Sequence, residues 1–213
     1  RPLSERTNFA IAFEEANPEL TGAEGVNQVP DLVLRLRWDP EIARFGFGLL
    51  GEGSHIQTAV LLRQLRGEAD NPAGDPRETL STTGYGLNIS GVMPAPWSLD
   101  RDRFRWAWNA GQGIGRYIAD LNAVGGQDAF YDVEADELQA LKGASAYLGY
   151  EHWWRPQVRS TLTAGYVWVD NLDSQPADSL KRTERFSLNL AWSPIPRLDL
   201  VAEYLWGRRI NLD

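Results

Sequence analysis

The feature that most constrains this chain is a regular alternation of apolar and polar side chains within short stretches of sequence. In residues 182–192 the large apolar side chains occupy every second position, namely Phe186, Leu188, Leu190 and Trp192. Successive side chains of a β-strand point to opposite sides, so this stretch predicts a strand with one apolar and one polar face.

The same alternation recurs along the chain. It predicts nine strands, at residues 7–14, 31–38, 55–66, 84–93, 101–110, 143–153, 158–169, 182–192 and 197–207. The strands at 55–66 and 143–153 fit less well because large side chains stand at polar positions. These are Leu61 and Leu65 in strand 55–66, and Tyr147 and Trp153 in strand 143–153. Residues 43–50 could form a tenth strand, but we interpret them as part of an extended turn.

The predicted connections alternate in length. The long ones are 15–29, 67–80, 111–142 and 170–181, and the shorter ones are 39–54, 94–100, 154–157 and 193–196. This alternation is typical of an antiparallel up-and-down transmembrane β-barrel with short periplasmic turns and long outer loops. We therefore expect an all-β, porin-like domain over residues 1–213, present as about 9–10 strands of an incomplete barrel.

A soluble β-sandwich also alternates, so other features must separate the two classes. Aromatic residues stand near the ends of the apolar faces, as Tyr and Trp do at a membrane boundary; they are Trp38, Trp154, Trp168, Trp192 and Trp206. The opposite faces carry Arg, which costs about 2–4 kcal/mol on a lipid-facing side at mid-depth. The alternative is a soluble β-barrel with a tryptophan core that binds an apolar ligand.

Composition excludes several classes of function. There is no cysteine and there are two histidines, His55 and His152, so disulfides and a His-rich metal site are not expected. The net charge of −8 argues against nucleic-acid binding, which requires a basic surface. No histidine has a recognisable Ser partner and no carboxylates are spaced for paired acid–base work, so we expect no catalytic residue and no cofactor.

The candidate functional residues are arginines on the polar phase of the strands and in the segment after 101–110. They are Arg35, Arg37, Arg63, Arg101, Arg103, Arg105, Arg116, Arg159 and Arg185. A guanidinium group is always charged and offers a planar fork to carboxylates, so a lumen lined with such groups would attract anions. The alternative is that they pair across neighbouring strands with Glu14, Asp31, Glu151, Asp199 and Glu203.

The Gly-rich stretch 111–116, GQGIGR, superficially matches a phosphate-binding loop. Such a loop requires a parallel strand before it and a helix after it, whereas this one follows an antiparallel strand. A second interpretation is that the segment folds inward and narrows a pore, with Arg116 and Tyr117 lining the constriction.

Several longer stretches are distinctive, and they include DLVLRLRWDP, GYGLNISG, GYEHWWRPQVRSTLTAGYVWVDN and LKRTERFSLNLAWSPIPRLDLVAEYLWGRR. In this order they resemble the DcaP-like family of outer-membrane porins, and the likeness is most specific at 143–209. The resemblance implies a homotrimer of roughly sixteen-stranded barrels in the bacterial outer membrane, in contact with lipid and lipopolysaccharide. It also implies passive passage of small anionic solutes, dicarboxylates in particular.

The chain departs from a complete barrel of this family. It lacks the first strands and ends at Asp213 without a closing strand, and nine is an odd number where bacterial single-chain barrels have an even one. We therefore expect a barrel fragment truncated at both ends. A third functional class stays open, a structural or adhesive outer-membrane protein with a plugged lumen and active loops.

Overall fold

The computed structural model describes residues 2–40, 53–69, 78–95, 101–119 and 121–212. Nine long strands form its wall: β2 (Thr7–Glu14), β5 (Asp31–Trp38), β6 (His55–Ala69), β7 (Glu78–Pro94), β8 (Arg103–Gln112), β11 (Lys142–Arg155), β12 (Val158–Asp170), β13 (Leu180–Ile195) and β14 (Leu198–Asn211). The shorter elements are β1 (Pro2–Ser4), β3 (Leu20–Thr21), β4 (Glu24–Gly25), β9 (Ala129–Asp132), β10 (Glu137–Ala140) and two 3-10 turns, η1 (Gly115–Tyr117) and η2 (Asn122–Val124).

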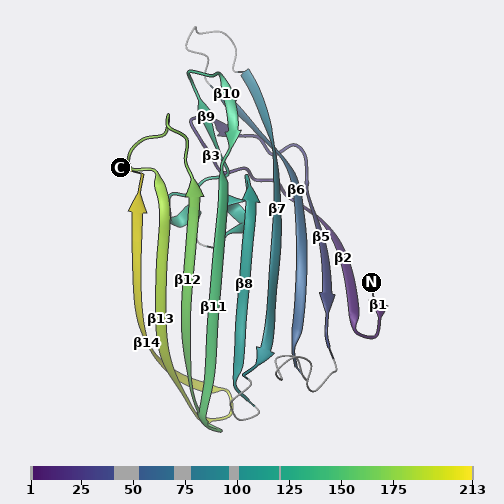
Figure 1. The fold of residues 1–213 in the computed structure, drawn as a ribbon, viewed down its shortest axis with the longest axis vertical. Helices are drawn as coiled ribbons and strands as arrows, with labels where there is room; N and C mark the ends of the chain where they lie inside the picture. The colour runs from purple at the N-terminus through teal and green to yellow at the C-terminus, as the bar shows by residue number, and fades with distance from the viewer. Residues whose placement is uncertain (1, 41–52, 70–77, 96–100, 120, 213) are drawn as a thin grey trace.

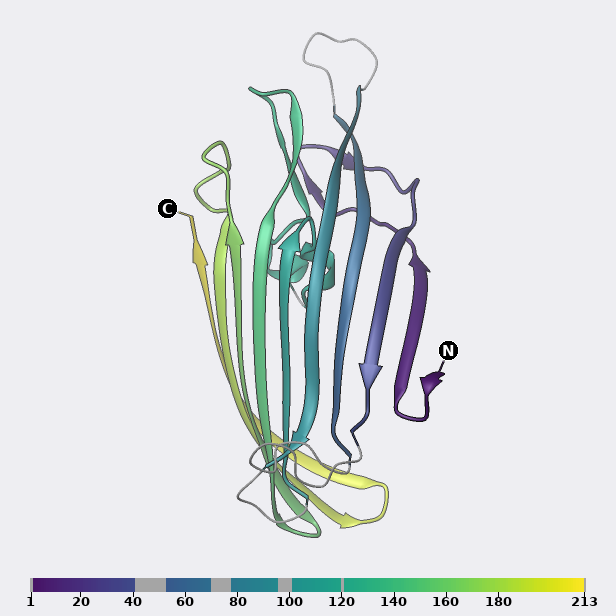
Figure 2. The same ribbon diagram turned by 45° about the vertical axis from the view of Figure 1, so that its right-hand side comes forward.

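The long strands form one antiparallel sheet in chain order (Figures 1 and 2). The order is β1-β2-β5-β6-β7-β8-β11-β12-β13-β14, with β4 paired to the end of β6. Tight turns at 156–157 and 196–197 join strands at one end, which we call the turn end. The opposite, loop end carries a small sheet of β10, β9 and β3.

All nine predicted strands are present and antiparallel, which confirms the all-β prediction. The differences lie at strand ends, where β7 begins at Glu78 instead of residue 84 and β8 begins at Arg103 instead of residue 101. The short strands β1, β3, β4, β9 and β10 were not predicted because two to four residues are too few for alternation to be recognised. The possible strand at 43–50 falls outside the described residues.

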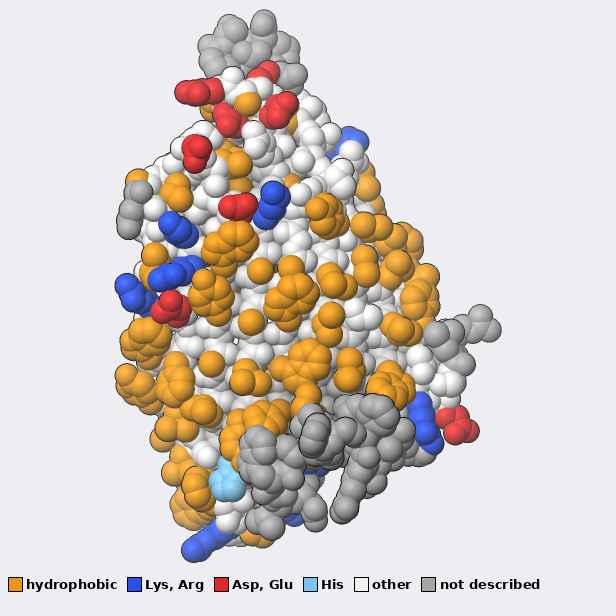
Figure 3. Space-filling view, viewed as in Figure 1, with side chains coloured by type: hydrophobic (Ala, Val, Ile, Leu, Met, Phe, Trp, Pro, Cys, Tyr) orange, Lys and Arg blue, Asp and Glu red, His pale blue; other side chains and the backbone are white. Residues whose placement is uncertain are grey.

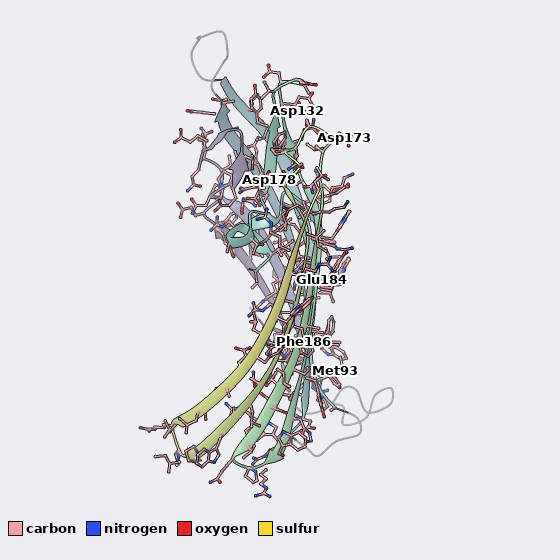
Figure 4. The ribbon with its side chains drawn as sticks, turned by 90° about the vertical axis from the view of Figure 1, so that its left-hand side faces the viewer. Met93, Asp132, Asp173, Asp178, Glu184 and Phe186 are labelled. Carbon is pink, nitrogen blue, oxygen red and sulfur yellow. The ribbon has the colours of Figure 1, made fainter. Side chains whose placement is uncertain are left out.

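The sheet is curved, and its convex face is apolar. Figure 4 shows Phe186 and Met93 on the convex side and the two 3-10 turns on the concave side. Apolar side chains cover the middle of the convex face as a wide belt, and charged side chains gather at its two ends (Figure 3). Large apolar side chains such as Leu188 and Trp192 are exposed within this belt, so this face is suited to lipid rather than to water.

The concave face is polar at its centre. One cross-strand row contains Arg35, Asn88, Asn109 and Ser145. Asn88 donates to the side-chain oxygen of Asn109 at 2.7 Å, and Asn109 donates to the Ser145 hydroxyl at 2.8 Å. This ladder satisfies side-chain polar groups at the centre of the wall, where they face the concave side.

The described residues have two hydrophobic clusters, and both lie toward the loop end. The larger one packs the segment that follows β8 against the concave face, and it consists of Leu61, Ile114, Ile118, Leu121, Phe130, Leu141, Val169 and Leu180. The smaller one holds the β9–β10 hairpin on β6, and it consists of Leu65, Ala69, Ala129, Tyr131 and Leu138. Buried apolar packing therefore supports the inserted and outer segments more than the middle of the wall.

Candidate pore-lining site

The most informative feature of the concave face is an inserted segment, residues 113–119 and 121–128, which follows β8. The chain leaves the strand at Gly113, where φ is 64° and an added Cβ would lie 2.7 Å from a methyl group of Leu65. Only glycine fits a left-handed backbone with so little room. Ile114, Ile118 and Leu121 are then buried against the wall. The segment therefore lies on the concave face, and its role in narrowing a pore stays a prediction.

The inserted segment crosses most of the concave face. Near its start, the Tyr117 hydroxyl lies 2.9 Å from Oδ2 of Asp31 on β5 and 3.2 Å from a carboxylate oxygen of Glu14 on β2. Near its end, an added Cβ on Gly125 would lie 3.5 Å from the guanidinium group of Arg209 on β14. The segment therefore reaches from the first long strand to the last one.

A buried ion cluster holds this segment, and Arg63 is its centre. The Nε atom of Arg63 lies 3.0 Å from Oδ2 of Asp31, and its Nη1 atom lies 2.9 Å from Oδ1 of Asp128. All three side chains have no exposed surface. The prediction that Arg63 lines an open lumen is therefore wrong for this structure, because its guanidinium group contacts protein on every side.

Two further contacts of Arg63 are with backbone carbonyl groups. Its Nη1 atom donates to the carbonyl oxygen of Gly113 at 2.9 Å, and its Nη2 atom donates to that of Ala16 at 2.7 Å. The guanidinium carbon also lies 5.3 Å from the centre of the Tyr117 ring, within the range of a cation–π interaction.

Asp128 receives hydrogen bonds from backbone as well as from Arg63. The amide groups of Glu19 and Arg116 each donate to it at 3.0 Å. Burial raises the pKa of Asp128 and the nearby positive charge of Arg63 opposes that rise. A carboxylate in this setting stays charged only while its donors stay in place, so Asp128 couples the loop before β3 to the inserted segment.

Apart from Arg63 and Arg116, the predicted arginines lie between the inserted segment and the turn end. Three of them have carboxylate partners: Arg37 with Asp39 at 2.6 Å, Arg105 with Glu151 at 3.4 Å, and Arg159 with Asp199 at 2.7 Å. The pairing alternative is thus correct for Asp31, Glu151 and Asp199. These partly exposed pairs differ from the Arg63 cluster, since their side chains retain contact with water.

A stack of aromatic and cationic groups occupies the turn end of the concave face. The guanidinium carbons of Arg101 and Arg159 lie 5.3 and 5.4 Å from the centre of the Trp153 ring. The indole Nε1 atom donates to Glu151 at 3.3 Å. These contacts explain why a large aromatic side chain, Trp153, stands on the polar face, since its ring supports two guanidinium groups.

Two of the predicted arginines are neighbours of this stack along and across the strands. Arg103 is the cross-strand partner of Glu151, and Arg105 forms the ion pair with the same residue. We call Arg101, Arg103, Arg105 and Arg159 the turn-end arginine cluster. Arg35, Arg37 and Arg185 lie on the same face nearer to the inserted segment, in register with Asn88, Ser90 and Gly165 respectively.

His152 has structural surroundings. His152 lies on the convex face with its Nδ1 atom 2.6 Å from the buried carboxylate of Asp102, which also accepts a hydrogen bond from Tyr150 at 2.7 Å. These contacts fix the turn that precedes β8.

Within the described ranges no group of three or more His, Asp or Glu residues could hold a metal ion, and no helix there has the length and apolarity needed to cross a membrane.

A sheet that is apolar outside, polar inside and crossed on its inner face by a folded-in segment defines the wall of an outer-membrane β-barrel. The family described as DcaP outer membrane protein matches residues 102–213. This chain belongs to the DcaP outer membrane protein family, and its location is the bacterial outer membrane. The family is one of outer-membrane proteins and not of enzymes.

A solved structure supports the fold independently. The crystal structure of the outer membrane channel DcaP of Acinetobacter baumannii matches with a TM-score of 0.78 and 17% sequence identity. The match covers 100% of this chain and 55% of that channel, so the chain spans about half the length of the structure. No curated protein matches the chain.

Proposed function

We propose that this chain supplies part of the wall and the constriction of a passive diffusion channel for small anionic solutes such as dicarboxylates. The observation that carries the proposal is that the inserted segment and the predicted arginines share one face of the sheet. An anion moving along that face would meet guanidinium groups at successive heights. The family assignment supports an outer-membrane setting for such a channel.

The proposed pore-lining residues are the predicted arginines other than Arg63. They are Arg35, Arg37, Arg101, Arg103, Arg105, Arg116, Arg159 and Arg185. Passage requires that binding be favourable enough for entry and weak enough for exit. Arginines that already share carboxylates, such as Arg105 with Glu151, meet this requirement because a solute competes with an internal partner for the same donors.

The assembly and the lipid partners belong to the same proposal. We propose that the complete protein is a homotrimer in contact with outer-membrane lipid through the convex belt and with lipopolysaccharide at the loop end. Acidic residues, including Asp132, Asp173 and Asp178 (Figure 4), lie at the loop end.

The test is the reversal potential of the full-length protein in planar bilayers under a salt gradient. Replacing Arg103 and Arg105 with Ala should move the reversal potential toward the cation side, since two lumenal charges are lost. Arg182→Ala is the matched control, because Arg182 pairs with Glu184 at 3.5 Å beyond the convex belt. An equal effect of the control, or no effect of the double variant, would remove the arginines from the selectivity mechanism.

Two other functional classes make different predictions. A soluble binding protein would fold without detergent, which conflicts with the large exposed apolar belt of the convex face. A structural or adhesive barrel would insert into bilayers without conductance. Steady current through the full-length protein would therefore separate the channel from that alternative.

A further inference from the structure

We infer that Arg63 is the positioning residue of the constriction, which it holds in the lumen by binding both ends of the inserted segment. This inference rests on the proposed channel function. It assigns to Arg63 a role in pore size, whereas the turn-end arginine cluster acts on charge selectivity.

The geometry is that of a single cation closing a loop. The carbonyl oxygen of Gly113 is at the first residue of the inserted segment and the carboxylate of Asp128 is at the last one. Both lie 2.9 Å from the same nitrogen, Nη1 of Arg63. The remaining nitrogens face Asp31 on β5 and the carbonyl oxygen of Ala16 before β3. One guanidinium group therefore ties both ends of the segment to the wall.

Only arginine can make this set of contacts. Its guanidinium group carries five N–H donors in a fixed plane, which is needed to reach acceptors on four separate parts of the chain. Lysine would bring the same charge to one atom with three donors, and glutamine would bring neither the charge nor the fork. A substitution at Arg63 leaves Asp31 and Asp128 buried without their shared counter-ion. This strongly disfavours the arrangement in which the inserted segment is packed against the wall.

Apolar packing holds the segment to the wall but does not fix where it lies. Ile114, Ile118 and Leu121 are buried in the larger hydrophobic cluster. Such contacts are non-directional, whereas hydrogen bonds to charged groups impose a geometry. The position of the segment across the lumen therefore depends on the ion cluster.

The side chains that face the lumen depend on the same cluster. Tyr117 and Arg116 are half-buried, and Arg116 donates to the carbonyl oxygen of Glu15. The Tyr117 hydroxyl has one hydrogen to share between Asp31 and Glu14, which are cross-strand partners. Because Arg63 holds Asp31, it also sets the orientation of the phenol ring. A hollow of about 190 Å³ remains beside Tyr117, Ile114 and Asn109.

The first experiment compares unit conductance and reversal potential of the full-length protein in planar bilayers. Arg63→Gln and Arg63→Lys should raise the unit conductance and cause frequent transitions between levels, while the reversal potential stays on the anion side. Arg182→Gln is the control and should change neither quantity, because Arg182 pairs with Glu184 outside the proposed lumen. A wild-type protein without conductance would refute the proposed function. A conducting wild type with an unchanged Arg63→Gln variant would refute this inference alone.

The second experiment locates the segment directly. The chain contains no cysteine, so Ala123→Cys places a single thiol at an exposed position of η2. A bulky charged thiol reagent should reduce the current of this variant, and the reduction should be lost when Arg63→Gln is added. An equal reduction in both backgrounds would overturn the inference. If Arg63→Gln does not fold, Asp128→Asn serves in its place, because it leaves Arg63 paired with Asp31 and removes one end of the tie.

Discussion

The assignment of the two faces can be tested by adding one positive charge to each face at adjacent positions of β11. Leu148 is 51% exposed on the convex face, where its cross-strand partners are Trp106 and Ala164. Tyr147 is 42% exposed on the concave face, opposite Gly165. Leu148→Arg and Tyr147→Arg thus introduce the same group at the same height, one toward lipid and the other toward water.

The expected costs differ widely. Arginine on the lipid face near mid-depth should lower the free energy of unfolding by about 2–4 kcal/mol. With a factor of ten for every 1.4 kcal/mol, this is a loss of roughly 30-fold to several hundred-fold in the ratio of folded to unfolded protein. Tyr147→Arg should change the free energy of unfolding by roughly 0.5 kcal/mol, as for other water-facing substitutions.

The measurement is reversible urea unfolding in phospholipid vesicles, followed by tryptophan fluorescence. Leu148→Ala should be measured alongside, so that the loss of apolar contact is subtracted from the cost of the charge. If Tyr147→Arg destabilises the protein as much as Leu148→Arg, the concave face does not border water and the lumenal role of the arginines is refuted.

Two further predictions concern the inner face. Trp153→Ala should weaken anion preference in planar bilayers, because Arg101 and Arg159 lose the ring that supports them. Ile118→Ala should lower the free energy that holds the inserted segment on the wall by about 2–5 kcal/mol. The expected result is faster proteolysis within the segment, while the wall stays protease-resistant.

The strands could be predicted because lipid and water impose opposite requirements on the two sides of a thin wall. Phe186 to Trp192 alternate strictly within the apolar belt, where a misplaced charge is costly. Outside the belt that requirement ends, and prediction became less accurate there. The early start of β7 at Glu78 is an example, since no lipid boundary constrains the side chains near it.

The side chains that broke the alternation turned out to mark the site. Leu61 and Leu65 stand at polar positions because the inserted segment and the β9–β10 hairpin cover them. Trp153 does so because two guanidinium groups lie over its ring. The burial of Arg63 could not be predicted in the same way. Its partner Asp128 is distant in sequence and on a loop, where no periodic pattern relates the two positions.

Pore size and charge selectivity should be separable properties of this wall. Arg105 of the turn-end arginine cluster is 8 residues before Gly113, where the inserted segment begins directly after β8. At about 3.3 Å per residue the two positions are roughly 26 Å apart along the wall, which is about three Debye lengths at physiological salt. Their effects should therefore add: Arg63→Gln combined with Arg105→Gln should show the conductance of the first variant and the reversal potential of the second. A double variant whose selectivity depends on Arg63 would mean that the inserted segment, and not the turn end, selects the charge of the solute.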